Sequence, residues 1–333
     1  MGLRLSGCGA AGKPALRIQA RLKYRNTALA GSEKSTTPPL YLCKTTEEVA
    51  ERAAVGTVAR MAGVRTGAWE RMDSGVKPAA RRIARTVLPV LFAGNRVQCP
   101  CCERRFRSFM THAGRSGARC PSCLALERHR VLWLYLCNGG IGEPPLRVLH
   151  IAPEFAIQRR LRNHPGVTYA SADLDSASLA DIQADVTDLP LPDDDFDVVV
   201  CNHVLEHVDD DRRAMSELLR VLKPGGRALM QHPVDEDREA TYEDPAITSP
   251  EERKAAFGQW DHVRVYGRDF TRRLQEAGFD VDVVDLYAAT APEDRARHGL
   301  AREPIYVCTK PAAYRRTSRF HRAQPTSASE RAR

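Results

Sequence analysis

The chain of 333 residues has no run of 18 apolar residues, which is about the length that a membrane-spanning helix needs. It also has no apolar segment ahead of the box Leu5-Ser6-Gly7-Cys8, which a cleavable export signal would require. These two absences predict a cytoplasmic protein without a membrane span. The sequence therefore has to be interpreted as that of a globular protein, and its length allows one sizeable core and a smaller module.

Acidic residues are scarce at the beginning of the chain. There is none before Glu33, and residues 1–98 hold 17 Lys or Arg against 6 Asp or Glu, whereas residues 99–333 hold 33 against 36. The net charge of +8 is thus concentrated in the N-terminal extension, and a shorter basic stretch follows in the tail. Basic extensions can contact nucleic acid or anionic lipid, but most are solvated arms. We expect residues 1–76 and 311–333 to be largely disordered.

The remainder divides into two parts. Residues 77–140 are predicted to contain a helix at 78–92, a cysteine-rich segment and a linking helix at 124–137. From 141 to 310 strand and helix patterns alternate, which predicts an α/β fold with a Rossmann-like, doubly wound and mostly parallel sheet. The expected strands are 146–151, 167–172, 181–185, 196–201, 227–233, 279–284 and 304–309, and the expected helices are 154–163, 210–222 and 268–277.

Four cysteines have the spacing of a metal site. Two residues separate Cys99 from Cys102 and Cys120 from Cys123, and 17 residues lie between the two pairs. Such pairs match a tetrahedral four-thiolate zinc site, and a Pro after the first Cys of each pair helps to form its turn. Cys101 is an alternative ligand in the first pair. Because four thiolates leave no open coordination position, we expect a structural Zn²⁺ in a small zinc ribbon.

Several motifs follow one another in a fixed order along the α/β part. "FDVVV" is followed by "LEH" and then by "RVLKPGG", which leads into the apolar "ALM". Together they resemble class I S-adenosylmethionine-dependent methyltransferases of the type 11 group, over about residues 146–310. The resemblance implies an enzyme that uses S-adenosylmethionine as its cofactor and acts on an unknown methyl acceptor.

The ligand of such a sheet lies outside the carboxyl ends of the strands, near the point where the strand order reverses. Asp173 follows the second strand and is expected to bind the ribose hydroxyls, with Asp175 as the fallback and a helix cap as the alternative role. Asp185 follows the third strand and offers an acceptor to the adenine amine, while Val186 offers a backbone donor. Asn202 leaves the end of the switch-point strand.

The first loop, "LHIAPE", departs from the usual acid followed by Gly-x-Gly. His150 stands in place of the acid, Ala152 in place of the first Gly, and Glu154 opens the next helix, where it suits the positive N-terminus or the ammonium group of the cofactor. A methionine-type ligand has no pyrophosphate, so it has less need of a glycine-lined cradle. The loop and the segment "FGQWDHVRVYG" at 257–267 resemble a bacterial methyltransferase-like subgroup that also carries zinc knuckles.

Methyl transfer needs an aligned acceptor and, for some acceptors, a base. His203 and His262 are the candidate catalytic residues, with plain packing as the alternative for both. Glu206 and His207 of the "LEH" turn are expected to be structural. Arg264 and Tyr266 are the candidate substrate residues, because Arg264 can hold a carboxylate or phosphate.

Two other functions compete with the methyltransferase. In the first, the zinc ribbon and basic arms bind nucleic acid and the α/β domain is vestigial. The second, a nicotinamide-dependent enzyme, lacks the G-x-G-x-x-G motif. The near-neutral charge of residues 99–333 disfavours a long RNA footprint, so we expect a small molecule or a glycan precursor as the substrate.

Overall fold

The computed structural model describes residues 87–176, 178 and 180–314. The predicted basic extension, the basic tail and most of the helix expected at 78–92 lie outside the described residues, although residues 87–91 are helical. The described helices are α3 (Glu127–Tyr135), α4 (Phe155–Arg162), α5 (Asp211–Val221), α6 (Pro250–Phe257), α7 (Phe270–Glu276), α8 (Leu286–Ala289) and α9 (Pro292–His298), with a short π-helix at Leu136–Gly140 and the 3₁₀ turn η2 at Leu205–His207.

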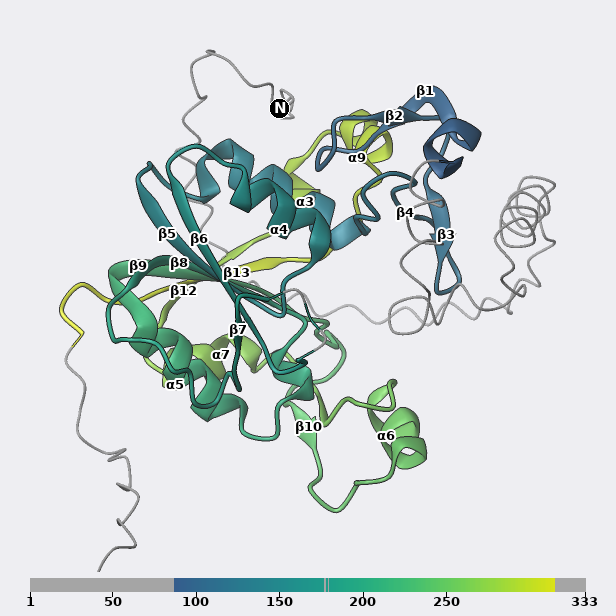
Figure 1. Cartoon of the computed structure of the whole chain (residues 1–333). Helices are drawn as coiled ribbons and strands as arrows, with labels where there is room; N and C mark the ends of the chain where they lie inside the picture. The colour runs from purple at the N-terminus through teal and green to yellow at the C-terminus, as the bar shows by residue number, and fades with distance from the viewer. Residues whose placement is uncertain (1–86, 177, 179, 315–333) are drawn as a thin grey trace, which may run out of the picture.

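A seven-stranded sheet forms the centre of the molecule (Figure 1), and the strand order is β12-β13-β9-β8-β5-β6-β7. Strand β13 runs antiparallel to both of its neighbours, and the other neighbouring pairs are parallel. The order reverses between β5 and β8, where the crevice of a doubly wound sheet lies. The strands of this sheet are β5 (Leu146–Ile151), β6 (Val167–Asp173), β7 (Ile182–Gln183), β8 (Phe196–Asn202), β9 (Leu222–Gln231), β12 (Asp280–Val284) and β13 (Ile305–Thr309).

Alternate residues of the central strands supply two separate cores, because successive side chains of a strand point to opposite faces. Val148, Val198 and Val200 pack against α3 and α4 on one face. On the other face, Val199 and Cys201 pack against α5 and α7. Figure 1 shows α3 and α4 on one side of the sheet and α5 and α7 on the other. Near-continuous apolar runs such as "VVVC" are what a strand buried on both faces requires.

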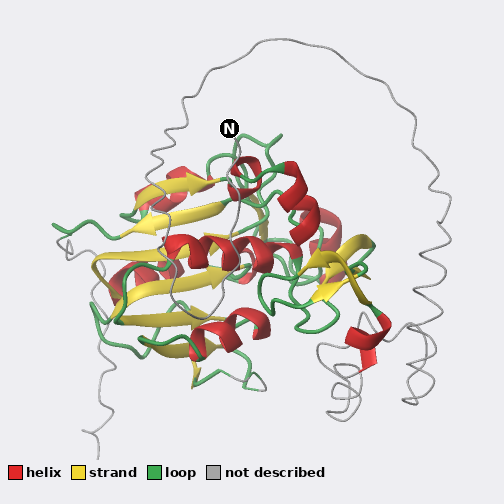
Figure 2. Cartoon of the chain, turned by 90° about the horizontal axis from the view of Figure 1, so that it is seen from above, coloured by secondary structure: helices red, strands yellow, loops and turns green. Residues whose placement is uncertain are grey.

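The cysteine module, residues 93–123, is built on two small hairpins. Strand β1 (Ala93–Gln98) pairs with β2 (Arg105–Phe106), and β3 (Met110–His112) pairs with β4 (Arg115–Arg119). In Figure 2 these short strands lie at one end of the molecule, beside the large sheet. The module is attached to the sheet domain through α9, because His298 Nδ1 lies 2.9 Å from the Gln98 carbonyl oxygen.

Arg130 of α3 reinforces this attachment. Its guanidinium is buried and donates to the carbonyl oxygens of Ala118, Ala125 and Gly299, at 2.8, 2.9 and 2.6 Å. One side chain therefore joins the cysteine module to the segment that follows α9.

The predicted α/β fold with a doubly wound, mostly parallel sheet is confirmed, and each expected strand of the sheet is present within a few residues. Strand β9 begins at Leu222, earlier than expected, because Leu222 already pairs with Phe196; the Lys-Pro-Gly-Gly residues form an irregularity before pairing resumes between Arg227 and Val198. The sequence analysis missed three helices, α6, α8 and α9, and the antiparallel pair of β10 (Tyr242–Glu243) and β11 (Arg264–Val265). Within the described ranges, no helix has the length and apolarity needed to cross a bilayer.

Candidate cofactor and acceptor site at the carboxyl edge of the sheet

The carboxyl ends of β5, β6 and β8 lie at one level. Ile151 pairs with Ala172 on one side and with Cys201 on the other. The next residue of each strand, namely Ala152, Asp173 and Asn202, therefore stands at the same edge. Ala152 N donates to the Ala172 carbonyl oxygen at 2.8 Å, which keeps the first loop close to β6. Three residues predicted to contact the cofactor are thus brought together at the switch point.

The first loop is fixed by a buried imidazole. His150 is fully buried, its Nε2 lies 2.7 Å from Glu154 Oε2, and its Nδ1 lies 3.1 Å from the Tyr169 hydroxyl. Ala152 has a φ of +46°, the left-handed conformation that glycine adopts at lower cost. The loop therefore turns as a glycine loop does, and the strain at Ala152 is opposed by the bond between His150 and Glu154.

Glu154 is held as an anion. Burial by itself raises its pKa, but the hydrogen bond from His150 and the charge of the nearby Arg128 lower the pKa to about 2. Asn202 Nδ2 also donates to Glu154 Oε1, at 3.4 Å. The carboxylate does not cap α4 although it stands at the N-cap position. It faces the edge of the sheet, where a cationic group of a ligand can reach it.

Two further residues come from α3, and the sequence analysis missed them. His129 Nε2 lies 3.6 Å from Glu154 Oε1, and burial lowers the pKa of His129 to about 3, so its imidazole is neutral. Arg128 acts electrostatically on His129, Glu154 and His203, so its charge lies near this edge. No local motif marks these residues, because helix α3 precedes the sheet domain in sequence.

The second and third loops supply the expected carboxylates. Asp173 is half-buried at the end of β6, and its Oδ1 accepts from the backbone N of Asp175 at 3.1 Å. Asp185 is exposed, and its Oδ1 accepts from both the backbone N and the hydroxyl of Thr187, each at 2.8 Å. One oxygen of each carboxylate thus shapes its own turn. Val186 is buried, at 6% exposure, beside Asp185.

Two amides at the ends of β8 and β9 have buried polar atoms without hydrogen bonds in the described part of the chain. These atoms are Asn202 Oδ1 and both Nε2 and Oε1 of Gln231, and the two residues are register partners. Buried polar groups are normally satisfied by protein, water or ligand. An acceptor such as Asn202 Oδ1, next to the Glu154 carboxylate, suits the ammonium group of an amino-acid-like ligand.

His203 follows Asn202 directly and is clamped between two carboxylates. Its Nε2 lies 2.6 Å from Glu303 Oε1 and its Nδ1 lies 3.3 Å from Glu206 Oε1. Burial lowers the pKa of His203, but the bonds to Glu206 and Glu303 outweigh it and raise the pKa to about 9. The imidazole is therefore protonated at neutral pH and donates to both carboxylates. Glu303, which precedes β13, was not found from the sequence.

The segment at 257–267 lies beside this turn. His262 is buried, and burial, followed by the nearby His207, lowers its pKa, so it is neutral. Arg264 Nη1 and Nη2 donate to the carbonyl oxygens of Leu205 and Asp209, at 2.7 and 2.8 Å. The Tyr266 hydroxyl donates to Asp211 Oδ2 at 2.8 Å. Arg264 and Tyr266 thus hold the turn after β8 in this structure, and their contact with a substrate stays a prediction.

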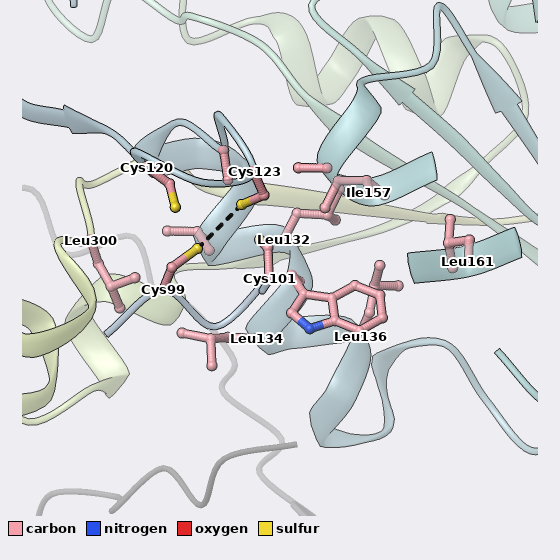
Figure 3. Packing of buried hydrophobic residues seen from close by; sticks show 14 of the residues in the cluster. Cys99, Cys101, Cys120, Cys123, Leu132, Leu134, Leu136, Ile157, Leu161 and Leu300 are labelled. Carbon is pink, nitrogen blue, oxygen red and sulfur yellow. Dashed lines mark hydrogen bonds between the residues drawn. The ribbon is translucent and has the colours of Figure 1, made fainter. Parts of the chain in front are cut away.

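The four expected cysteine ligands converge in the cysteine module. Their Sγ atoms lie within 4.8 Å of one another, with 3.6 Å between Cys99 and Cys123 and 3.7 Å between Cys102 and Cys120. Figure 3 shows Cys99, Cys120 and Cys123 with their sulfur atoms directed toward a common centre. Cys101 instead donates to the His129 carbonyl oxygen at 3.5 Å, so it lies outside the group of four.

The two knuckles have the same backbone geometry. The N–H of Cys99 donates to the Arg104 carbonyl oxygen at 3.0 Å, and the N–H of Cys120 donates to the Ala125 carbonyl oxygen at 2.9 Å. Four residues after each first Cys, a residue with positive φ closes the turn, with φ 64° at Glu103 and 62° at Leu124. This repeated turn directs both thiols of each pair inward.

Comparisons with known proteins match part of the chain to methyltransferases. A family model described as "Methyltransferase domain" matches residues 153–230. Over 49 residues the chain is 51% identical to a demethylmenaquinone methyltransferase of Clavibacter sepedonicus, covering 15% of this chain and 20% of that protein. Over 139 residues it is 32% identical to a probable S-adenosylmethionine-dependent methyltransferase of Mycolicibacterium smegmatis, covering 38% of this chain and 50% of that protein. The chain thus spans half or less of the length of these relatives.

Among solved structures, the [4+2]-cyclase SpnF aligns with 69% of this chain and 94% of its own, at 16% identity and a TM-score of 0.40.

Proposed function

We propose that this chain, whose α/β domain is a class I methyltransferase domain, is an S-adenosylmethionine-dependent methyltransferase. The observation that carries the proposal is the meeting of Glu154, Asp173 and Asn202 at the switch point of the sheet. The family match over residues 153–230 supports it, since that segment supplies these three residues.

The residues at this edge fit the cofactor. Glu154 and the unbonded Asn202 Oδ1 would hold the ammonium group of the methionine part, and Asp173 would hold the ribose hydroxyls. Asp185 and Val186 would contact the adenine ring. The charge of Arg128, close to Glu154, suits the carboxylate of the methionine part. His150 and Ala152 would set the path of the first loop, so "LHIAPE" takes the part of the usual glycine loop.

When bound, S-adenosylmethionine supplies a methyl carbon whose bond to sulfur breaks, leaving the electron pair on sulfur, as the acceptor atom forms its new bond. The protein has to align the acceptor and exclude water. His203 and His262 are the proposed catalytic residues, since His203 directly follows β8 and His262 packs against His207 of η2, with 4.7 Å between the ring centroids. His203 is a cation between Glu206 and Glu303, so we assign it to orienting the acceptor rather than to removing a proton.

A structural zinc ion in the cysteine module is the second part of the proposal. Four thiolates at about 2.3 Å from one zinc ion lie about 3.8 Å apart. The Sγ distances of 3.6 and 3.7 Å in the two bonded pairs fit this arrangement. Cys99, Cys102, Cys120 and Cys123 would therefore be the ligands. The ion would hold the two hairpins together and, through them, the beginning of α3.

For the acceptor we propose a small molecule or glycan precursor rather than RNA. The slight excess of acidic residues over 99–333 supports this choice, because RNA-binding surfaces are usually strongly basic.

The test is calorimetric titration of the zinc-loaded protein with S-adenosylmethionine and S-adenosylhomocysteine, with an Asp173→Ala variant. The wild type should bind in the micromolar range, and the variant should bind roughly 10- to 100-fold more weakly, because it loses hydrogen bonds to a charged group.

The matched control is Asp282→Ala, which removes an exposed carboxylate from β12 at the far edge of the sheet. It should bind as the wild type does. If titration of the wild type with either ligand produced no heat of binding, the enzyme proposal would be overturned. A nucleic-acid-binding function would then be favoured. Equal binding by wild type and Asp173→Ala would instead overturn the ribose assignment alone.

A further inference from the structure

Three side chains beyond the end of β8 bring potential metal ligands together. Glu206 and His207 belong to η2, and His262 lies in the loop that leads into β11. One ligand atom from each residue lies within 4.8 Å of those from the other two. Glu206 and His262 are 1% and 5% exposed, whereas His207 is exposed, so the cluster is buried on one side and open on the other. We propose that this cluster binds a divalent transition-metal ion.

Both imidazoles are oriented by neighbours in the way that metal-binding histidines are. His207 Nδ1 lies 3.3 Å from both the backbone oxygen and Oδ2 of Asp261, which leaves Nε2 for an ion. His262 bonds to the backbone of Phe257, and its Nε2 lies 2.9 Å from Gln259 Nε2. Because that amide nitrogen donates, Nε2 is an unprotonated acceptor, and a metal ion would bind it by displacing the Gln259 side chain.

The Glu206 carboxylate is also fixed in position by neighbouring side chains. Glu206 Oε2 accepts from the buried His232 Nδ1 at 2.7 Å. Glu206 Oε1 is buried, and its partner is the protonated His203, whose Nδ1 lies 3.3 Å away. Asp261 Oδ1 is buried and makes no hydrogen bond within the described residues. This carboxylate oxygen, beside two imidazoles and the Glu206 carboxylate, favours a cation as its partner, because buried anions are normally paired or bound to metal.

The two segments that supply the ligands are fixed to each other through the backbone. Val263 N donates to the Glu206 carbonyl oxygen at 2.9 Å, and Arg264 bridges to the carbonyl oxygens of Leu205 and Asp209. These contacts organise the site without an ion, whereas the two hairpins of the cysteine module would be joined by the proposed zinc ion.

One carboxylate and two imidazoles leave open coordination positions, in contrast to four thiolates. The exposed side at His207 is where an oxygen ligand would enter. An ion there lowers the pKa of a bound hydroxyl or water. The consequence for the acceptor rests on the proposed function: a hydroxyl-bearing substrate would be bound by the ion next to His203. His262 would then contribute as a ligand and not as a base.

The experiment uses the full chain carrying zinc in the cysteine module, titrated with Mn²⁺ while electron paramagnetic resonance follows the free ion. Mn²⁺ prefers oxygen and nitrogen ligands, so it leaves the thiolates to zinc. The wild type should bind one equivalent, and the bound ion should enhance water-proton relaxation through its open position. His207→Ala and His262→Ala should each weaken binding at least ~10-fold.

His164→Ala, a histidine outside the cluster, is the matched control and should bind as the wild type does. His207 is exposed, so its variant should keep the melting temperature and the S-adenosylmethionine affinity of the wild type. Mn²⁺ that stays free with the wild type, or equal binding by the wild type and both variants, would overturn the metal site. A wild type that binds Mn²⁺ but does not bind S-adenosylmethionine would overturn the proposed function without contradicting the metal site.

Discussion

Glu154 lies at the end of the loop that follows β5, and it is bonded to both His150 and Asn202. Its ionised form is stabilised in the folded protein, which the lowered pKa of about 2 expresses. A loop that replaces glycines with a buried His–Glu pair keeps its shape through side-chain bonds. This loop conformation requires a left-handed backbone at Ala152, which is strained for a residue other than glycine.

This pairing predicts a specific dependence of stability on pH. Because the folded pKa of about 2 lies below the ordinary value of 4.5, the ionised Glu154 stabilises the fold fully above about pH 5, and this contribution is lost as the pH falls toward 2. Its size is on the order of 3 kcal/mol. Unfolding by urea, measured for wild type and Glu154→Gln between pH 7 and pH 3, should show the two free energies converging as the pH falls. A difference that stays constant over this range would contradict the assignment.

At the scale of elements, the contact between η2 and β11 positions the two candidate catalytic residues, because His203 precedes η2 and His262 precedes β11. The two elements are joined by Arg264, whose Nε also donates to Glu243 Oε2 at 2.9 Å. The Arg264 side chain is 3% exposed, and its guanidinium donates hydrogen bonds to three carbonyl oxygens and one carboxylate. This planar fork matches several acceptors at once, which lysine cannot do.

Arg264→Lys should therefore lower the free energy of unfolding by roughly 2–3 kcal/mol, since buried carbonyl groups lose their donors. Thermal and urea unfolding measure this change. Arg272→Lys on α7 is the matched control, because Arg272 is 65% exposed and its surface ion pairs contribute little. If Arg264→Lys kept full stability but raised the KM for an acceptor, Arg264 would be a substrate residue instead, as the sequence suggested.

At the scale of the whole molecule, the cysteine module and the sheet domain meet through α3. The helix begins next to the second knuckle, and His129 near its start reaches Glu154 while Arg130 bonds to Gly299. Leu132, Leu134 and Leu136 pack in the same buried cluster as the cysteines (Figure 3). The module thus supports one wall of the proposed cofactor site.

Removal of zinc should consequently weaken cofactor binding as well as unfold the hairpins. Cys123→Ser, or treatment of the wild type with a strong chelator, should lower the S-adenosylhomocysteine affinity by at least ~10-fold, because α3 would lose the support of its first turn. Calorimetry and metal analysis on the same samples measure both effects. Cys101→Ser, outside the group of four, should keep zinc and affinity. Full affinity in the zinc-free protein would show that the module has no part in the cofactor site.

The sequence determined the features that depend on neighbouring residues. Apolar runs such as "VVVC" marked buried strands, the Cys-x2-Cys spacing marked both knuckles, and the carboxylates after each strand could be assigned to the edge of the sheet. Even α6 had a readable local signal, since Ser249 and Glu252 form a capping box around Pro250. That helix was missed because its apolar pattern is weak.

Only the tertiary structure decided the contacts that join distant segments. His129 meets Glu154, Glu303 meets His203, and His262 meets Glu206 and His207 across 25, 100 and 55 or more residues of chain. No local spacing encodes these pairs, because they follow from the order of the strands and the way the helices pack. Protonation states depend on the same contacts, which is why the sequence suggested His203 as a base while its two carboxylate partners make it a cation.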